Sequence, residues 1–508
     1  MTNRRRFFIN GIMLTAVGLA IRSVSLALNS FVTRTVGAEG IGLFTLIGTV
    51  YSFAVTFATS GISLTVTRTV SSAIGEGRAK ELGEILRSSI LYSLIFSVFS
   101  SLVLFFGAPY FAESVLSDLR CILPLRILSA SLVPIALSSV FAGYFVGVKR
   151  VGYNAVIQVL GQFFKVFITV LLVLKFARLD PALGVTMLAL SMTLTEISVF
   201  LVALIQFLID KKRNLAREKH RKSHFSEVSR MALPLAVSAY IRSALLTLEH
   251  ILIPNRLRSR GESHKESLVS YGVLHGMALP MLLYPMAPLS SFSGLLVPEF
   301  SESLAKNEEK RLCRMASEAL NTTLCYSIAS MTLVALFSEE LGYVVYNSFE
   351  AGHYIAIMAP VLPIMYLDHV ADAMLKGIGE HVYSMWVNIS DSVLSIVLVW
   401  FLIPRLGIAG YAVVIVVMEG YNFILSVLRL YSKIKFRIRA SKYLFLPVAS
   451  AFISACVSKR IFTKNGSMTQ PVWLFCEIIF AVCLFLVIYM LGSLLMEGKE
   501  KVTQKNPR

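Results

Sequence analysis

Several charged side chains lie inside long apolar stretches of this sequence, where a charge is costly. Arg22 falls near the middle of VGLAIRSVSLALNSF, residues 17–31, and Asn29 follows seven residues later on the same face of a helix. A guanidinium stays charged in proteins, and at the centre of a membrane-spanning helix it costs about 2.5–3.5 kcal/mol. Such a group usually faces a bundle interior or a water-filled cavity, where arginine can bind phosphate oxygens. Arg22 is therefore a candidate contact for an anionic substrate.

A wider set of cations and amides in the apolar stretches has the same chemistry. Gln158, Gln162 and Lys165 are spaced i, i+4 and i+7, which places them on one face of a helix. The alternative for each cation is pairing with backbone carbonyls or reaching the membrane interface, and Arg126, near a span end, fits that alternative best. The candidate substrate-binding residues are Arg22, Asn29, Arg126, Gln158, Gln162, Lys165 and Arg242.

Acidic residues and one amide form a second set, mostly in the later part of the chain. A carboxylate inside a span can bind a cation or carry a proton, so these residues are candidates for coupling to an ion gradient. Asp368 and Asp372 are one turn apart, but they lie towards the cytoplasmic end of their predicted span, where solvation is the simpler explanation. The candidate coupling residues are Glu249, Asn388, Asp391 and Glu419.

The composition places these residues in a membrane protein. The chain has 508 residues, of which 56% are hydrophobic and 15% are charged, whereas a soluble protein carries about 25% charged residues. The net charge of +18 does not indicate nucleic-acid binding, because the basic residues lie at the ends of apolar runs. The six cysteines form no CxxC pair, which favours free thiols over disulfides or metal ligands.

The apolar runs predict an all-α polytopic membrane protein with about fourteen transmembrane helices, each of roughly 20 apolar residues. The N-terminal run is too long for a signal peptide, and we interpret it as a retained first span. Most Lys and Arg then fall on the cytoplasmic side if both termini are cytoplasmic. NRLRSRGESHKE, residues 255–266, is the main exception, and it indicates either a miscounted span or an anion-attracting mouth. The predicted spans are 8–33, 41–66, 88–107, 122–147, 153–174, 184–209, 231–254, 268–297, 317–337, 354–375, 382–403, 408–428, 443–462 and 471–495.

A basic segment, DKKRNLAREKHRKSHF at 210–225, divides the chain into two halves. The predicted organisation is an N-lobe of six spans at 1–210, a basic cytoplasmic linker at 211–227, a C-lobe of six spans at 228–433, spans thirteen and fourteen at 434–496, and a cytoplasmic tail at 497–508.

The two halves resemble each other in sequence. IRS at 21–23 recurs at 241–243, so Arg242 corresponds to Arg22. GYFVGVKRVGYNAVIQVLGQFFKVF, 143–167, parallels AMLKGIGEHVYSMWVNISDSVLSIV, 373–397, and pairs Gly147 with Gly377. Both halves begin on the cytoplasmic side, so the repeat is parallel. Transporters built from such repeats bind substrate between the lobes and alternate access by rocking one lobe against the other.

The segment YGVLHGMALPMLLYPMAPLSSFSGLLVPEFSE, residues 271–302, resembles a stretch typical of the stage V sporulation protein B-like polysaccharide exporters. GAEGIGLF, 37–44, and the glutamine–lysine pattern of 143–166 look like companion features. That family lies in the multidrug/oligosaccharidyl-lipid/polysaccharide flippase superfamily. The resemblance implies a V-shaped, MATE-like bundle of two six-helix lobes plus two C-terminal helices.

The same resemblance implies that the cargo is an undecaprenyl-linked saccharide, carried across the cell membrane for envelope or spore-cortex assembly. It implies membrane lipids as partners, along with polysaccharide or peptidoglycan synthesis proteins. Arg22, fifteen residues before Gly37, matches a cavity arginine of the more distantly similar lipid II flippases. Lys165 stands where the closer family has a basic residue, while Gly161 departs from an acidic residue common there.

The sequence contains no Walker A, GxSxG or HExxH motif, and we expect no enzyme activity, no resident cofactor and no metal. Energy would then come from an H⁺ or Na⁺ gradient, from the membrane potential or from downstream consumption of the substrate. Two alternatives remain at this stage. The acids of the second half are compatible with a multidrug or metabolite cation exporter of the same fold, and a non-transporting membrane scaffold is the second alternative.

Overall fold

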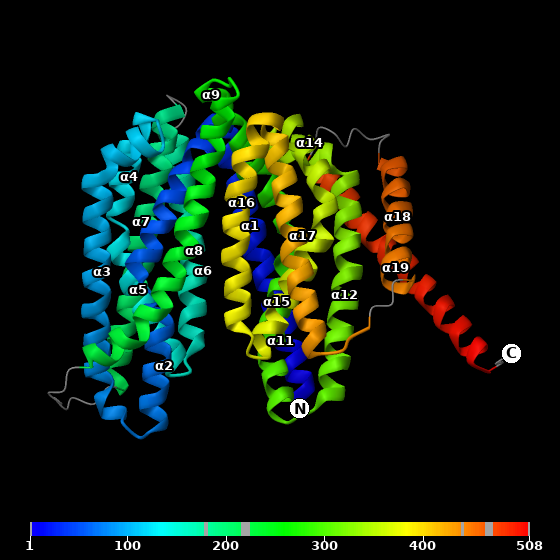
Figure 1. Cartoon of the computed structure of the whole chain (residues 1–508), viewed down its shortest axis with the longest axis horizontal. Coiled ribbons are helices and arrows are strands. Elements are labelled where there is room, and N and C mark those ends of the chain that lie inside the picture. The colour runs from blue at the N-terminus through cyan, green and yellow to red at the C-terminus, as the bar shows by residue number, and fades with distance from the viewer. Residues whose placement is uncertain (1–2, 177–180, 215–223, 438–440, 463–470, 506–508) are drawn as a thin grey trace. The chain divides into compact units, whose positions relative to one another are not determined.

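The described secondary structure of the computed structural model is helical throughout (Figure 1). The structure describes residues 3–176, 181–214, 224–437, 441–462 and 471–505. The helices up to residue 271 are α1 (Asn3–Thr59), α2 (Ile62–Gly75), η1 (Ala79–Glu81), α3 (Leu82–Tyr110), η2 (Phe111–Val115), η3 (Leu119–Cys121), α4 (Ile122–Ser129), α5 (Leu132–Gly147), α6 (Val151–Phe176), α7 (Pro181–Asn214), α8 (Phe225–Ser259) and α9 (His264–Tyr271).

The remaining helices begin with a broken segment, residues 272–286, that contains two prolines. They are η4 (Gly272–Ala278), α10 (Leu279–Leu283), η5 (Tyr284–Met286), α11 (Ala287–Ala305), α12 (Glu309–Leu336), α13 (Ser338–Tyr346), α14 (Phe349–Met358), η6 (Ala359–Val361), α15 (Leu362–Gly377), α16 (His381–Leu406), α17 (Ile408–Lys433), η7 (Ser441–Phe445), α18 (Leu446–Phe462) and α19 (Pro471–Lys505).

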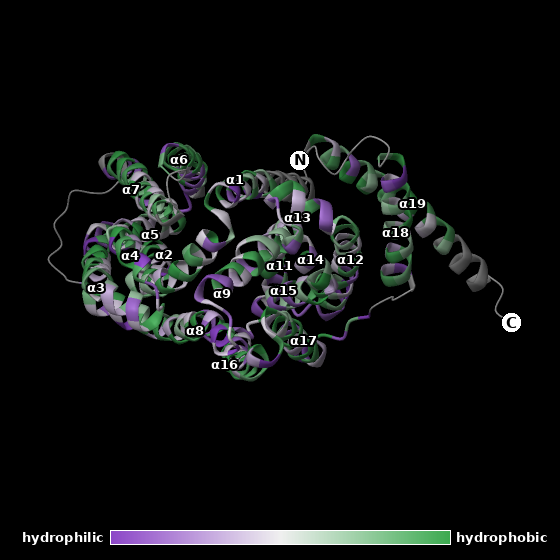
Figure 2. Ribbon diagram, turned by 90° about the horizontal axis from the view of Figure 1, so that it is seen from above, coloured by the Kyte–Doolittle hydropathy of each residue, from purple (hydrophilic) through white to green (hydrophobic). Residues whose placement is uncertain are grey.

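The predicted class, an all-helical polytopic membrane protein, is confirmed. Among the described residues, 12 helices are long and apolar enough to cross a membrane, or 13 if the bent pair α4–α5 forms one span. Figure 2 shows hydrophobic colouring along most of the helices. The predicted count of fourteen is not confirmed, and the difference includes residues 18–75, which form one candidate instead of two.

Gly37 breaks α1 between the two spans that the sequence predicts there. Its backbone, at φ 81° and ψ 171°, is non-helical and lies in a region that essentially only glycine adopts. The 57 residues of α1 would otherwise extend roughly 86 Å at 1.5 Å per residue. That length is far greater than the hydrocarbon core of about 30 Å. The break therefore reorients a chain too long for a single crossing.

The chain divides into two compact units, and the division differs from the predicted lobes. Residues 31–272 form one unit, and residues 1–30 form the other together with 273–508. The start of α1 thus groups with the C-terminal helices, whereas α8 groups with the N-terminal ones. Part of the predicted linker, 215–223, lies outside the described residues.

Matching contacts in the two units support the predicted internal repeat. Ser71 Oγ donates to the Gly147 carbonyl at 3.2 Å, and Ser301 Oγ donates to the Gly377 carbonyl at 2.7 Å. Both members of the second pair lie 230 positions after those of the first. A Cβ on Gly147 would come within 2.8 Å of Val70 Cβ, and the absence of a side chain permits this close helix packing.

A second correspondence lies in the turns that follow α5 and α15. Arg150 forms an ion pair with Asp210, and the corresponding Glu380 pairs with Arg429 and with Lys433, both at 2.8 Å. Hydrogen bonds from Lys433 and Arg429 hold the pKa of Glu380 below its usual value. The two turns therefore have the same place in the fold but ion pairs of opposite polarity.

Candidate functional site

Arg22 is attached to the broken segment between α9 and α11. Its Nη1 donates to the Leu283 carbonyl, at the end of α10, and the side chain is half-buried. A guanidinium has five N–H donors. No other hydrogen bond or ion pair of this guanidinium occurs among the described residues. One donor therefore anchors the group while the others stay available to an oxyanion.

The broken segment offers carbonyls to side chains because it alternates between short helical types. Tyr366 Oη donates to the Leu282 carbonyl at 3.0 Å, and Tyr326 Oη donates to the Pro285 carbonyl at 2.6 Å. Proline has no N–H and interrupts helical hydrogen bonding, and the segment contains Pro280 and Pro285. The two tyrosine rings stack with centroids 6.3 Å apart, which adds rigidity behind Arg22.

Asn29 bonds to the same broken segment nearer its N-terminal end. Its Nδ2 donates to the Gly276 carbonyl at 3.0 Å, within the π-helix η4. Ser23 and Tyr284 share a hydroxyl–hydroxyl hydrogen bond of 2.7 Å. The face of α1 predicted from the Arg22–Asn29 spacing is therefore the face that holds the broken segment. Pairing with backbone carbonyls was the structural alternative to substrate binding that the sequence left open. The bonds of Arg22 and Asn29 to the Leu283 and Gly276 carbonyls are of that structural kind.

The other predicted cations lie in the unit formed by residues 31–272. Arg126, on α4, is exposed and its Cζ lies 5.5 Å from the Phe105 ring centroid, a cation–π contact that fits the structural alternative. Lys165, on α6, is exposed and interacts electrostatically with Glu196 on α7. Gln158, like Lys165, is exposed on α6.

Arg242 also lies in that unit, exposed on α8. Arg22 belongs to the other unit, so the predicted pairing of these two arginines across one cavity stays a prediction. Glu249, seven residues after Arg242 on α8, is buried at 7% exposure and lies in the same unit as Arg242.

Three acids converge in the unit that holds Arg22. Asp368, Asp391 and Glu419 lie on α15, α16 and α17 and act on one another electrostatically. Asp368 Oδ1 is buried and has no hydrogen-bond partner among the described residues. Solvation, the explanation favoured by the sequence, suits Asp372, which pairs with Lys376 at 2.5 Å, but not Asp368. Sequence reasoning missed Asp368 because its position near a predicted span end hid its neighbours on other helices.

Asn388 stands one turn before Asp391 on α16, and its Nδ2 donates to the Ser384 carbonyl of its own helix at 2.6 Å. Among the described residues, no group of three His, Cys, Asp or Glu side chains is placed to hold a metal ion. Carboxylates inside membrane spans commonly bind ions or relay protons, which keeps these acids candidates for that role.

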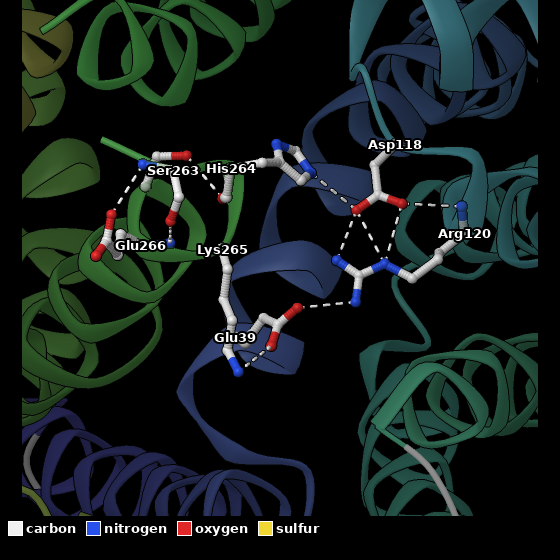
Figure 3. Close-up of polar contacts among 8 residues, drawn as sticks. Glu39, Asp118, Arg120, Ser263, His264, Lys265 and Glu266 are labelled. Atoms are coloured by element: carbon white, nitrogen blue, oxygen red, sulfur yellow. Dashed lines mark hydrogen bonds and ion pairs between the residues drawn. The ribbon is translucent and has the colours of Figure 1, made fainter. Parts of the chain in front are cut away.

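The end of the basic segment 255–266 joins a local network of ion pairs through His264 and Lys265 (Figure 3). Arg120 bonds to Asp118 at 2.7 Å and to Glu39 at 2.8 Å. His264 Nε2 lies 3.0 Å from Asp118, and Lys265 lies 3.7 Å from Glu39. Burial raises the pKa of Asp118, but the bonds to Arg120 and His264 outweigh burial and leave the pKa below its usual value. Acids thus neutralise part of the charge that made this loop an exception to the positive-inside pattern.

Comparison with known proteins gives a consistent result. The profile of the family described as "Polysaccharide biosynthesis protein" matches residues 8–304, and the MatE profile matches residues 275–401. Stage V sporulation protein B of Bacillus subtilis (strain 168) is 27% identical over 421 residues, which cover 81% of each chain. Lipid II flippase MurJ of the same organism is 22% identical over 392 residues, which cover 72% of this chain and 71% of that protein.

Solved structures show the fold to which the chain is similar. A structure of lipid II flippase MurJ in an inward closed conformation superposes with a TM-score of 0.71 at 13% identity, covering 95% of this chain and 99% of that one. An inward-facing multidrug resistance MATE family transporter gives a TM-score of 0.67 at 15% identity, covering 82% and 98%. The predicted MATE-like helical fold is therefore confirmed.

Proposed function

Because the chain belongs to the polysaccharide biosynthesis protein family, we propose that it translocates an undecaprenyl-pyrophosphate-linked saccharide or peptidoglycan precursor across the cytoplasmic membrane. Its similarity to a lipid II flippase and to a sporulation protein supports this cargo class. The observation that carries the proposal is Arg22, a half-buried cation in a candidate span whose guanidinium bonds to a single carbonyl among the described residues.

The pyrophosphate is the part of such a cargo that is hardest to move, because a charged group loses its hydration in an apolar medium. Arg22 can offer its remaining donors in the planar arrangement that fits phosphate oxygens. Tyr326 and Tyr366 hold the carbonyl-bearing segment, so the guanidinium has a fixed position before the cargo arrives. Fixed donors lose little entropy on binding.

The other substrate-binding residues extend the same role. Lys165, Gln158 and Gln162 on α6 would contact the saccharide and the second phosphate, and Arg242 on α8 would meet the cargo in the alternate state. Alternating access between the two units is part of the proposal, as is a cell-membrane location with both termini in the cytoplasm. Synthesis proteins for the polysaccharide are the proposed protein partners.

Coupling to an H⁺ or Na⁺ gradient is proposed for Asp391 and Glu419, with Asp368 as a third member. Acids that face one another in an apolar bundle repel when all are ionised, so binding one cation or proton relieves that repulsion. Glu249, in the other unit, would act separately from these three. The carboxylates and Asn388 could supply oxygen ligands without a resident metal.

A reconstitution assay tests the proposal. Purified protein in liposomes receives a fluorescent undecaprenyl-pyrophosphate-linked saccharide, and an impermeant quencher reports the fraction that has crossed. We expect protein-dependent translocation that Arg22→Gln slows about tenfold or more, because one charge-assisted contact contributes roughly 1.5–3 kcal/mol. Arg22→Lys should retain more activity, since it keeps the charge but loses the planar donors. Arg405→Gln, at an exposed position on α16, is the matched control.

Wild-type protein that moves no anionic lipid-linked substrate would contradict the proposal. The three-acid cluster favours one other function, export of organic cations on the same fold. Uptake of a fluorescent cation such as ethidium into inverted liposomes distinguishes the two. Transport of the cation together with no transport of the lipid-linked saccharide would establish the exporter instead.

A further inference from the structure

A basic pocket lies at the start of α12 and contains none of the residues assigned above. It has a volume of about 450 Å³, and its lining includes Arg314, Glu318, Lys435, Arg437 and Tyr443. All of these residues belong to the unit formed by 1–30 and 273–508. We propose that this pocket binds the phosphate or pyrophosphate headgroup of a membrane lipid.

The segment after α17 is shaped to present cations to the pocket. Ile434 has extended backbone, at φ −133° and ψ 116°. Ile434 and Phe436 are buried at 5% and 8% exposure, whereas Lys435 and Arg437 are exposed. Successive side chains of an extended chain point to opposite sides. Burial of the two apolar residues therefore fixes the two basic ones on the outer side.

Side chains of α12 hold the backbone of Arg437 at both of its polar groups. The Arg437 N–H donates to Ser317 Oγ at 3.0 Å, and Asn321 Nδ2 donates to the Arg437 carbonyl at 3.0 Å. Ser317 and Asn321 also line the pocket. The position of Arg437 is thus set without using its guanidinium, as in a preorganised binding site.

The arginines of the pocket differ from other cations in the same unit. Arg311 pairs with Glu299 and Glu308, and Arg429 pairs with Glu380. In the part of the chain that the structure describes, the side chains of Arg314 and Arg437 have no hydrogen bond or ion pair. Unpaired guanidinium groups at one pocket suit an anion with several oxygens, which they can bind in bidentate fashion.

The charge of the lining favours an anion. Lys435 lines the pocket, and its Nζ lies 4.4 Å from the centroid of the neighbouring Tyr431 ring, a cation–π contact. Among the described lining residues, Arg314, Lys435 and Arg437 stand against one acid, Glu318, which leaves an excess of two positive charges. The sequence SKIKFRIRASK, 432–442, carries five basic residues and no acid. Basic runs beside a span bind anionic lipid headgroups.

The surroundings of the pocket indicate a lipid rather than a soluble anion. The candidate span Lys442–Phe462 begins five residues after Arg437, which places the pocket at the level where a span ends. Tyr443 lines the pocket, and Phe445, two residues on, is 68% exposed. α18 packs against α12 (Figure 1). A headgroup in the pocket would therefore have apolar surface beside it for its chain.

Two lipids share this chemistry, namely an anionic phospholipid of the bilayer and a polyprenyl phosphate. The full-length protein in detergent is titrated with phosphatidylglycerol, phosphatidylcholine, undecaprenyl phosphate and inorganic pyrophosphate, and native mass spectrometry counts the bound molecules. We expect phosphatidylglycerol or undecaprenyl phosphate to bind at least tenfold more tightly than phosphatidylcholine. The tighter of the two identifies the source. Equal binding of phosphatidylcholine would overturn the proposal, and so would pyrophosphate that binds as tightly as either lipid.

Variants locate the binding. Arg314→Gln and Arg437→Gln should each weaken it about fivefold, from the contribution of one basic residue near an anionic surface. Arg405→Gln, exposed on α16, should leave it unchanged. Glu318→Gln should tighten binding, an outcome that misfolding cannot produce. Unchanged affinity in both arginine variants would refute the assignment of the pocket.

A second measurement uses Cys313, which also lines the pocket. Alkylation of the native protein by uncharged iodoacetamide, followed peptide by peptide, should slow at Cys313 when the tighter-binding lipid is added. Cys456, on α18, is the internal reference. Protection equal at both cysteines would contradict a headgroup in this pocket. The assays measure binding alone, so their failure leaves the proposed translocation standing, and a failure of translocation leaves the pocket standing.

Discussion

The close packing of α5 on α2 and of α15 on α11 depends on two glycines that the sequence repeat pairs. A Cβ on Gly377 would lie 2.7 Å from Phe300 Cβ and 3.0 Å from the Val297 carbonyl oxygen. A Cβ on Gly147 would lie 2.8 Å from Val70 Cβ. These neighbours are backbone or Cβ atoms, which cannot move away as the end of a flexible side chain can. The helices must therefore separate if alanine is introduced.

We expect Gly377→Ala and Gly147→Ala each to destabilise their unit by about 1–3 kcal/mol, the usual effect of overpacking. The gain in helix propensity, up to about 1 kcal/mol in a helix interior, is smaller here because both residues end their helices. For units of this size 1 kcal/mol corresponds to about 2–4 °C in melting temperature. The fall should therefore be about 2–12 °C.

Fluorescence-detected size-exclusion chromatography after heating, in detergent, measures this fall. Gly420→Ala is the matched control, because it lies inside α17 and a Cβ there would meet nothing within 4 Å. Its melting temperature should stay level or rise slightly. If the melting temperatures of Gly377→Ala and Gly147→Ala equal that of Gly420→Ala, the two helix pairs are not as closely packed as described, and the reasoning fails.

Three further predictions follow from the fold and the site. Gly37→Ala should lower the stability of the fold by about 1–3 kcal/mol, because the Gly37 backbone at φ 81° and ψ 171° is open essentially to glycine alone. The same melting assay measures the loss, and an unchanged melting temperature would mean that α1 is not broken at this residue. Because its folded-state pKa is lowered, Asp118 adds stability above its unfolded pKa of about 3.9, and that stability is lost as the pH falls through the folded value. Acidification from pH 5 to pH 3 should therefore lower the melting temperature of the wild type more than that of Asp118→Asn, and equal falls would argue against the network. Glu419→Gln should reduce the response of lipid translocation to an imposed H⁺ or Na⁺ gradient, measured in the same liposomes, while an unchanged response would remove Glu419 from the coupling group.

The helical membrane fold could be predicted because apolar runs of span length are a strong local signal. The grouping of spans into units could not be predicted in the same way. The place of the start of α1 is fixed by long-range bonds such as Asn29 to Gly276, which lie 247 residues apart in the sequence. Spacing showed that Arg22 and Asn29 share a helix face, but not what that face meets.

The hydrogen-bond partner of Arg22 could not be predicted from the sequence either. A backbone carbonyl has no sequence signature, so neither Leu283 nor its neighbours could be named from residue types. The prolines of the broken segment, residues 272–286, are the one signal that could have indicated free carbonyls there. Asp368 was misjudged because nearness to a span end says nothing of the carboxylates on α16 and α17.

The repeat also has an evolutionary consequence. In its register, Gln158, Gly161 and Lys165 on α6 correspond to Asn388, Asp391 and Ser395 on α16. One copy of the helix carries Lys165 where the other has Ser395, and the second carries Asp391 where the first has Gly161, although Ser71–Gly147 and Ser301–Gly377 preserve the same frame. An ancestral pair of identical chains would present the same charge twice. Duplication followed by divergence lets one polypeptide present both signs, an asymmetry that the proposed coupling of an anionic cargo to a cation gradient would use.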